Sequence, residues 1–260
     1  MARRQHTAAH VQRATESPTV EKKGGSKLLT VIMELLIVLG IVIGGYPLWE
    51  LFWTSYEVQG GVREAISNFE GKYPPGEGEP EHRTDAPPEI PTPSYGQLFG
   101  ILHVPAWNYM RTPIVAGTGP DVLDFGYAGW YENTQLPGQV GNFAMAGHRR
   151  SYGNNFRLVH ELRNSDELVV ETEDTYIIYQ VIHKEVVLPS AGWVLSPHPE
   201  GLDVSDNSRL ITLTTCHPEF GNTERYIVFG EFSYWTLKSE GKPEVIRKEI
   251  VENPTGKEEG

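Results

Sequence analysis

The chain has 260 residues, of which 39% are hydrophobic and 10% aromatic, and this content is sufficient for a packed core. The formal net charge is -12 at pH 7, which disfavours a nucleic-acid partner because neutralising phosphates requires a basic surface. The sequence contains no phosphate-loop or zinc-ligand spacing, so we expect no cofactor and no metal site.

The first predicted element is a membrane-spanning helix over residues 28–53. The run LLTVIMELLIVLGIVIGGYPLWELFW is almost continuously apolar over the ~20 residues that a bilayer core requires. Glu34 is the main objection, since a carboxylate in lipid is costly unless it is neutral, paired or close to the interface. A cleaved signal peptide and a buried core helix are competing interpretations, but the long polar leader and the uniform apolarity favour a membrane anchor.

The flanks of this segment predict its orientation. Residues 1–27 hold six Lys and Arg residues against two Glu residues. The positive-inside rule leaves this leader, which we expect to be disordered, in the cytoplasm and places everything after Trp53 outside. We therefore predict a single-pass protein of the cell membrane whose folded part is extracellular.

Residues 54–95 are predicted to be an extracellular linker. A short helix could form between residues 57 and 69, and the stretch after it, GKYPPGEGEPEHRTDAPPEIPTPSY, is rich in Pro, Gly and Glu. Because proline-rich chain is extended and stiff, we expect this segment to hold the folded part away from the lipid.

Short β-like runs separated by turn signals begin at Gly96 and predict one folded domain over residues 96–236. Their alternation and their β-branched and aromatic content indicate an antiparallel barrel or sandwich. Helical interruptions are expected near residues 122–129 and 155–163. The remaining residues, 237–260, are charged and are expected to form a fraying tail.

Cys216 is the only cysteine of the chain and lies at the end of the strand-like run LITLTTC. An unpaired thiol in an exported protein can be oxidised without giving any structural benefit, so a mere packing role is not expected. Pro218 cannot continue a central ladder, which ends the strand and places the thiol at the rim of the sheet. Cys216 is therefore a candidate nucleophile.

Arg225 and His148 are the predicted partners of this thiol. Arg225 opens the next strand, so antiparallel pairing brings its guanidinium to the thiol, where it favours thiolate and can bind an oxyanion. His217 is adjacent to Cys216 in sequence, but successive side chains in a strand point to opposite faces. His148 instead follows another apolar strand, GNFAMAG. Taken alone, these residues leave open a solvated Arg225 and a structural His148.

The segments GNFAMAGHRRSYG and LITLTTCHPEFGNTERYIVFGEF together resemble the sortases, membrane-anchored cysteine transpeptidases of Gram-positive bacteria. Their signature is TLxTC with an upstream histidine and a later arginine, and the resemblance covers residues 99–232. The form TLTTCHP, the opening FGILHVP, the segment LPGQVGNFAMAGHR and the N-terminal anchor are most similar to the class E sortases of actinobacteria.

The resemblance implies a closed eight-stranded β-barrel with short helices after the transmembrane helix. It makes Cys216 the nucleophile, His148 the general acid and base, and Arg225 the stabiliser of oxyanion and substrate. The implied reaction cleaves an LAxTG or LPxTG sorting signal of a surface protein between Thr and Gly through a thioacyl intermediate. The protein is then transferred to an amine of a peptidoglycan precursor, with hydrolysis as a side activity.

The substrate peptide is expected to meet four further residues: Thr214, Thr215, Tyr127 and Tyr131. A core or surface role stays open for both tyrosines. The long, proline-rich segment 188–204 corresponds to the connection that shapes the sortase groove. A calcium site is not expected, because the acidic residues are scattered.

Several alternatives stay open at this point. The enzyme could polymerise pilins by using a lysine as the amine, or the chain could be a non-catalytic, membrane-anchored β-barrel binding module. L,D-transpeptidase-like and papain-like enzymes fit poorly, since the former carry an arginine almost adjacent to the cysteine and the latter place cysteine before histidine.

Overall fold

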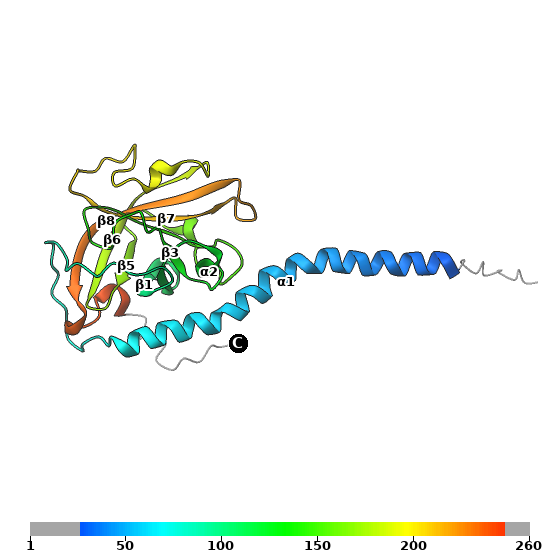
Figure 1. The fold of residues 1–260 in the computed structure, drawn as a ribbon, viewed down its shortest axis with the longest axis horizontal. Helices are drawn as coiled ribbons and strands as arrows, with labels where there is room; N and C mark the ends of the chain where they lie inside the picture. The colour runs from blue at the N-terminus through cyan, green and yellow to red at the C-terminus, as the bar shows by residue number, and fades with distance from the viewer. Residues whose placement is uncertain (1–26, 248–260) are drawn as a thin grey trace, which may run out of the picture. The chain divides into compact units, whose positions relative to one another are not determined.

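The structure, a computed structural model, describes residues 27–247. Eight strands close into a barrel in the order β1-β2-β3-β4-β7-β8-β6-β5, with α2 and short 3-10 helices in the connections (Figure 1). The closed eight-stranded barrel expected from the sequence is confirmed. The elements after the N-terminal helix are β1 (Leu98–Val104), η1 (Pro105–Trp107), β2 (Met110–Ala116), α2 (Pro120–Leu123), β3 (Ala128–Trp130), β4 (Gly141–Ala146), η2 (Val159–Glu161), β5 (Glu167–Glu171), β6 (Thr175–Val187), η3 (Gly192–Leu195), β7 (Arg209–His217), β8 (Glu224–Leu237) and η4 (Lys238–Glu240).

The barrel is mixed, whereas the residues alone indicated an antiparallel sheet. β2 pairs with β3 and β4 pairs with β7 in parallel, and the other neighbouring strands are antiparallel. Parallel neighbours need crossover connections, and here α2 lies between β2 and β3 while residues 147–208 lie between β4 and β7. The purely antiparallel prediction was therefore wrong.

The main core is built from one face of each strand. In β7, Ile211 and Leu213 are fully buried in this core, and Val228 of β8 lies opposite Leu213 and joins them. Side chains alternate between faces along a strand, so Thr212 and Thr214 point the other way. The same alternation assigns Cys216 to the face of the two threonines, outside the main core.

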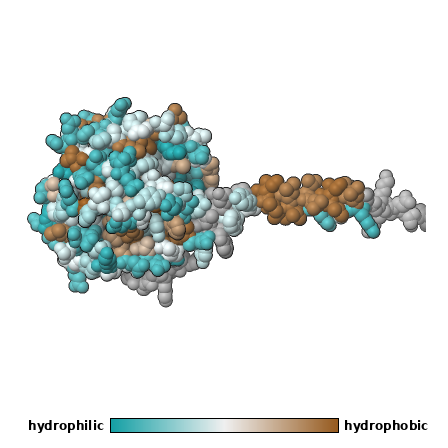
Figure 2. All heavy atoms as spheres, viewed as in Figure 1, coloured by the Kyte–Doolittle hydropathy of each residue, from teal (hydrophilic) through white to brown (hydrophobic). Residues whose placement is uncertain are grey.

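The N-terminal helix α1 runs from Lys27 to Lys72. Its segment Lys27–Tyr46 has a mean hydropathy of 2.6 and no buried residue, so by length and composition it could cross a bilayer. Hydrophobic residues, coloured brown, make up most of the surface of this part of the helix in Figure 2. The unit that ends at Gly45 is separate from the compact unit that begins at Tyr46 and includes the barrel. The leader predicted for residues 1–27 lies outside the described residues except for Lys27.

Within residues 54–95, predicted as a linker, the helix expected between residues 57 and 69 is present as the last part of α1, but it packs on the barrel. α1 continues to Lys72, and Ile66 and Phe69 on this part of the helix are buried against Ile101 of β1. Apolar residues four and three positions apart share one helix face, so burying that face extends the helix and fixes it to the barrel.

The proline-rich part of the predicted linker lies along the end of β8. The backbone N–H groups of Arg83 and Trp235 each donate to the other residue's carbonyl, at 3.0 and 2.9 Å, and the Trp235 indole donates to Asp85 Oδ1 at 3.1 Å. β7 pairs with β8 only as far as Glu231, so the later part of β8 has a free edge that this extended segment covers. The segment thus does not separate the barrel from α1.

The predicted tail also packs in part. Lys238 and Ile246 are 2% and 1% exposed, and the carboxylate of Glu240 binds the Arg83 guanidinium at 2.6 and 2.9 Å. Residues 238–247 therefore do not fray as expected, because Ile246 packs on side chains of β5 and β6. Residues 248–260 of the predicted tail lie outside the described residues.

A buried charged cluster joins this C-terminal segment to the barrel. His103 Nε2 lies 2.7 Å from Glu171 Oε2, and Lys238 Nζ donates to the other oxygen of the same carboxylate. Burial opposes the ionisation of Glu171, but the hydrogen bond to His103 and the charge of Lys238 outweigh it and hold the pKa of Glu171 below its usual value.

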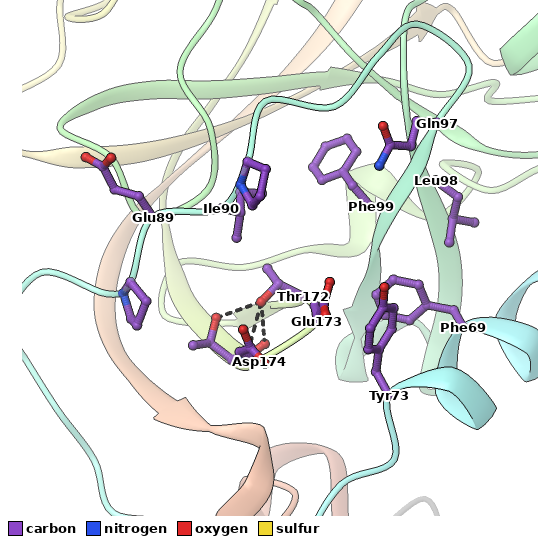
Figure 3. A pocket seen from close by; sticks show the side chains of 13 residues that line it. Phe69, Tyr73, Glu89, Ile90, Gln97, Leu98, Phe99, Thr172, Glu173 and Asp174 are labelled. Carbon is purple, nitrogen blue, oxygen red and sulfur yellow. Dashed lines mark hydrogen bonds between the residues drawn. The ribbon is translucent and has the colours of Figure 1, made fainter.

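A pocket of 120 Å³ opens where the end of α1 meets the β5–β6 turn (Figure 3). Phe69 and Tyr73 line it from one side, Ile90 of the proline-rich segment from another, and Thr172 and Asp174 from the turn. This turn lies at one end of the barrel, because Thr175 pairs with Leu237. Cys216 pairs with Arg225 at the other end of β8, so the pocket lies far from the thiol along the strand.

Candidate active site

The candidate site is built around Cys216 at the end of β7. The strand ends at His217, immediately before Pro218, as the sequence predicted. Cys216 lies directly opposite Arg225 in the antiparallel β7–β8 ladder. Directly opposite residues project from the same face of a sheet, so the register places both side chains on one face, and the action of Arg225 on the thiol stays a prediction. The thiol is partly exposed and free.

His148 reaches the same face from a third strand. β4 runs parallel to β7 with Ala146 opposite Thr214, and the ladder continues through a 3.1 Å hydrogen bond from Gly147 N–H to the Thr214 carbonyl. His148 comes two residues after Ala146, and Cys216 comes two residues after Thr214. Because side chains repeat on one face every second residue, alternation continued past the end of β4 would put the imidazole on the face of the thiol, at the same end of the barrel.

Asp124 is the partner of His148, and sequence reasoning missed it. Asp124 follows α2, and its Oδ1 lies 2.8 Å from His148 Nε2, with the two side chains 36% and 27% exposed. The Tyr152 ring lies 5.2 Å from the imidazole between centroids. Among the described hydrogen bonds none engages Nδ1 of His148. The sequence signal was only an acidic residue after a short helix.

The Arg225 guanidinium is held by its own turn. Nη1 donates to the carbonyls of Asn222 at 2.9 Å and Glu224 at 2.8 Å. In the described part of the chain Nη2 and Nε form no hydrogen bond, so they can donate to a substrate oxygen. A guanidinium presents several N–H donors in a fixed plane, and fixing one end orients the others.

His217 lies on the opposite face and has its own partners. Its Nδ1 accepts from Arg149 Nη1 at 2.8 Å, and its Nε2 lies 3.9 Å from Glu224. Arg149 is only 5% exposed, and its guanidinium also lies over the Tyr226 ring at 5.6 Å. The geometry therefore agrees with the expectation that His217 is not the base, and it shows Arg149, which sequence reasoning passed over, as the residue that holds it.

The four predicted substrate-binding residues separate into different surroundings. The Tyr131 hydroxyl lies 3.0 Å from Thr214 Oγ1, and Thr214 is on the face of the thiol. Thr215 points to the other face and donates to the Gly147 carbonyl at 2.7 Å, so it holds β7 to the chain just before His148. Tyr127 stacks on Phe125 with centroids 6.1 Å apart.

Tyr127 is the least well placed of these residues for a peptide at the thiol. Tyr127 is half-buried, and the pKa of its hydroxyl is raised by burial and, to a smaller extent, by the charge of Glu64 on α1. No described contact joins it to Tyr131 or to Cys216. Substrate contact by all four residues stays a prediction.

Segment 188–204 covers the thiol's face of the sheet further along the same strands. Asn142 of β4 is fully buried, and its amide donates to the carbonyls of Val194 and Ser196 at 3.0 and 3.1 Å. Thr212 donates to the same side chain at 2.7 Å. Val194 packs on Ile227 and Phe229, which face outward from β8. The segment is thus fixed beside the site.

The arrangement brings a free thiol, an imidazole and a guanidinium-bearing residue to one end of three adjacent strands. Such a set suits acyl transfer through a covalent intermediate. Within residues 27–247 no group of three His, Cys, Asp or Glu side chains is placed to hold a metal ion.

Comparison with known proteins agrees with this chemistry. A family model described as Sortase domain matches residues 102–233, about half of the chain. Sortase SrtE1 of Streptomyces coelicolor is 34% identical over 227 residues, covering 83% of this chain and 60% of that protein. The match thus spans less than two thirds of this relative's length. Sortase SrtE2 of the same organism is 29% identical over 219 residues, covering 79% of this chain and 82% of that protein.

Solved structures share the barrel. The SrtA sortase from Actinomyces oris is 46% identical with a TM-score of 0.61, covering 64% of this chain and 97% of that chain. The crystal structure of Sortase E1 from Streptomyces coelicolor with a tripeptide in the active site is 38% identical with a TM-score of 0.56, covering 58% of this chain and 97% of that chain. The resemblance to class E sortases is confirmed.

Proposed function

This chain belongs to the sortase family, and we propose that it is a cysteine transpeptidase acting on surface proteins that carry an LAxTG- or LPxTG-type sorting signal. The observation that carries this proposal is the pairing of Cys216 with Arg225 in the β7–β8 ladder, with His148 at the same end of the parallel neighbour β4.

In the proposed acylation, the Cys216 thiolate attacks the carbonyl carbon of the signal threonine and forms a carbon–sulfur bond. The free Nη2 and Nε donors of Arg225 hydrogen-bond the oxyanion that develops. His148 then gives its proton to the departing glycine nitrogen as the carbon–nitrogen bond breaks. The products are a thioacyl enzyme and a released C-terminal fragment.

In the second half-reaction an amine of a peptidoglycan precursor attacks the thioester. His148 removes the proton from the attacking nitrogen, the carbon–sulfur bond breaks, and the sulfur leaves as thiolate. One amide is broken and one is formed, so no cofactor is required. With water in place of the amine, the same steps hydrolyse the signal.

The proposed setting is the outer face of the cell membrane. The segment Lys27–Tyr46 anchors the chain in the bilayer, the N-terminus stays in the cytoplasm, and the barrel acts outside. The basic leader of residues 1–27 supports this orientation. A reporter enzyme that is active only outside the cell should show activity when it is fused after residue 247. The same reporter should be inactive when it is fused before residue 27.

The test of function uses the full chain in detergent micelles with LAxTG and LPxTG peptides. We expect an amide product when an amine is added, and slower hydrolysis when it is absent. Comparing a peptidoglycan-type amine with a lysine-containing pilin peptide identifies the acceptor. Cys216→Ala serves as the control and should give neither product. A wild-type chain that binds these peptides without converting them would instead be a binding module.

A further inference from the structure

We infer that the barrel-bound part of α1, through Val58 and Val62, positions His148 for transpeptidation. This inference rests on the proposed function, because it assigns a task to His148. It concerns residues 57–72 of α1, which we name the α1 extension, and the two loops that flank His148.

The two valines lie over two glycines. A β-carbon built at Gly126 would lie 3.0 Å from Val62 Cγ2 and 3.3 Å from Val58 Cγ2, and one built at Gly153 would lie 3.3 Å from Val58 Cγ2. Gly126 and Gly153 have φ angles of 78° and 92°, in the region that favours glycine. The glycines thus allow both loops to come close to the helix.

The α1 extension is itself held to the barrel. Val62 packs with Ile66 and Phe69 in one apolar cluster on β1, and the Glu70 carboxylate lies 3.2 Å from Arg111. Val58 stands one turn before Val62 on the same helix face. The position of Val58 is therefore set by contacts that the helix makes further along.

Both glycines belong to the loops that contact His148. Gly126 comes two residues after Asp124, whose carboxylate binds His148 Nε2 at 2.8 Å. Gly153 follows Tyr152, whose ring lies beside the imidazole. The Asn155 amide donates to the Tyr127 carbonyl at 2.9 Å, which ties the two loops to each other. A shift of the helix would therefore move both neighbours of His148.

The loop that carries Tyr152 needs such support. Ser151 and Tyr152 have φ angles of 65° and 44°, a region that is unfavourable for non-glycine residues and that persists only where the surroundings hold the backbone there. The α1 extension and the segment 124–127 provide that packing from one side. Without it, we expect Tyr152 and the imidazole to leave the arrangement described above.

The test uses the full chain in micelles, with the double variant Val58→Ala and Val62→Ala. We expect kcat for thioacyl formation to fall about 3- to 10-fold with little change in KM, because a misplaced proton donor slows the chemical step more than binding. In chains carrying ¹⁵N-labelled histidine, the His148 ring signals, assigned with His148→Gln, should shift.

Matched controls separate positioning from stability. Val169→Ala truncates a fully buried valine of β5 in a different apolar cluster, so it should lower the unfolding temperature while leaving kcat and the His148 signals near wild type. Gln59→Ala, on the exposed side of the helix, should change neither the unfolding temperature nor kcat. The double variant Val58→Ile and Val62→Ile keeps the apolar contacts, so its kcat should be near wild type.

The outcomes are distinct. An active wild type with unchanged kcat and unchanged His148 signals in the double alanine variant would overturn the inference and leave the proposed function intact. Equal losses of kcat in the double variant and in Val169→Ala would also overturn it, because the valines would then act through stability alone. A wild type that converts no peptide would instead refute the proposed function.

Discussion

At the scale of single residues, the site depends on which face of a strand each side chain occupies. Alternation along β7 was enough to separate Cys216 from His217, and the β7–β8 register then placed Arg225 opposite the thiol. Asp124 could not be predicted in this way. It binds His148 across a separation of 24 residues, and that contact depends on how a crossover connection returns to the barrel.

Asp124 is expected to orient His148. Replacing Asp124 with Ala removes the acceptor for Nε2, so we expect kcat/KM with a signal peptide to fall about 10- to 100-fold, with a smaller fall for Asp124→Asn, which can still hydrogen-bond. Steady-state kinetics measure this. Asp121→Asn is the control, because Asp121 binds Tyr95 from the same short helix and makes no described contact with His148. Unchanged kinetics in Asp124→Ala would contradict the assigned role.

The two histidines should respond differently to substitution. His148→Ala removes the proton-transfer group, and we expect thioacyl formation to slow about 10²- to 10⁴-fold. His217→Ala removes a partner of the buried Arg149, so we expect a lower unfolding temperature but thioacyl formation within about tenfold of wild type. Stopped-time mass spectrometry and thermal unfolding measure the two effects. A larger rate loss in His217→Ala than in His148→Ala would reverse the assignment.

At the scale of elements, composition predicted most strands well and the linker poorly, and it missed β3, which overlaps residues 122–129 that were expected to be helical. The β-branched runs became strands, and Pro218 marked the end of β7. The proline-rich stretch reads as a spacer when taken alone, yet β8 extends beyond its β7 partner and offers a free edge to it. Composition indicates how stiff a segment is. Which strand edge the segment covers depends on the lengths of strands elsewhere in the chain.

The buried cluster of His103, Glu171 and Lys238 joins β1, β5 and η4, and it should make stability depend on pH. Folding lowers the pKa of Glu171 below its ordinary value of 4.5, so the ionised carboxylate stabilises the fold fully at a pH above 4.5. This stabilisation is lost as the pH falls through the lower pKa that Glu171 has in the folded state. Denaturant unfolding between about pH 6 and pH 3 should therefore show a smaller acid loss for Glu171→Gln than for wild type.

Removing only one partner of this cluster should be costly at neutral pH. Lys238→Met leaves the buried Glu171 carboxylate with one partner fewer, and we expect the free energy of unfolding to fall by about 3–5 kcal/mol. Lys242→Met is the control, because Lys242 lies 3.5 Å from Glu70 in a less buried pair. Equal stability of Lys238→Met and wild type would show that the cluster contributes nothing to the fold.

At the scale of the whole molecule, the sequence predicted an anchored barrel with a cysteine site, and the closed barrel and the family are confirmed. The resemblance to the sortases carried that prediction, through TLTTC, an upstream histidine and a later arginine. The mixed strand order and the attachment of α1 to the loops beside His148 depend on contacts between distant segments, which spacing along the chain does not encode.

The central claim is that Cys216 forms a thioacyl intermediate with a sorting-signal peptide. Its most direct measurement is the mass of the full chain after brief reaction with an LAxTG or LPxTG peptide and acid quenching, followed by peptide mapping. We predict an added mass equal to the peptide portion ending in threonine, located on Cys216, released by hydroxylamine and absent from Cys216→Ala. A wild-type chain that never carries this mass, or amide product formed equally by Cys216→Ala, would contradict the account.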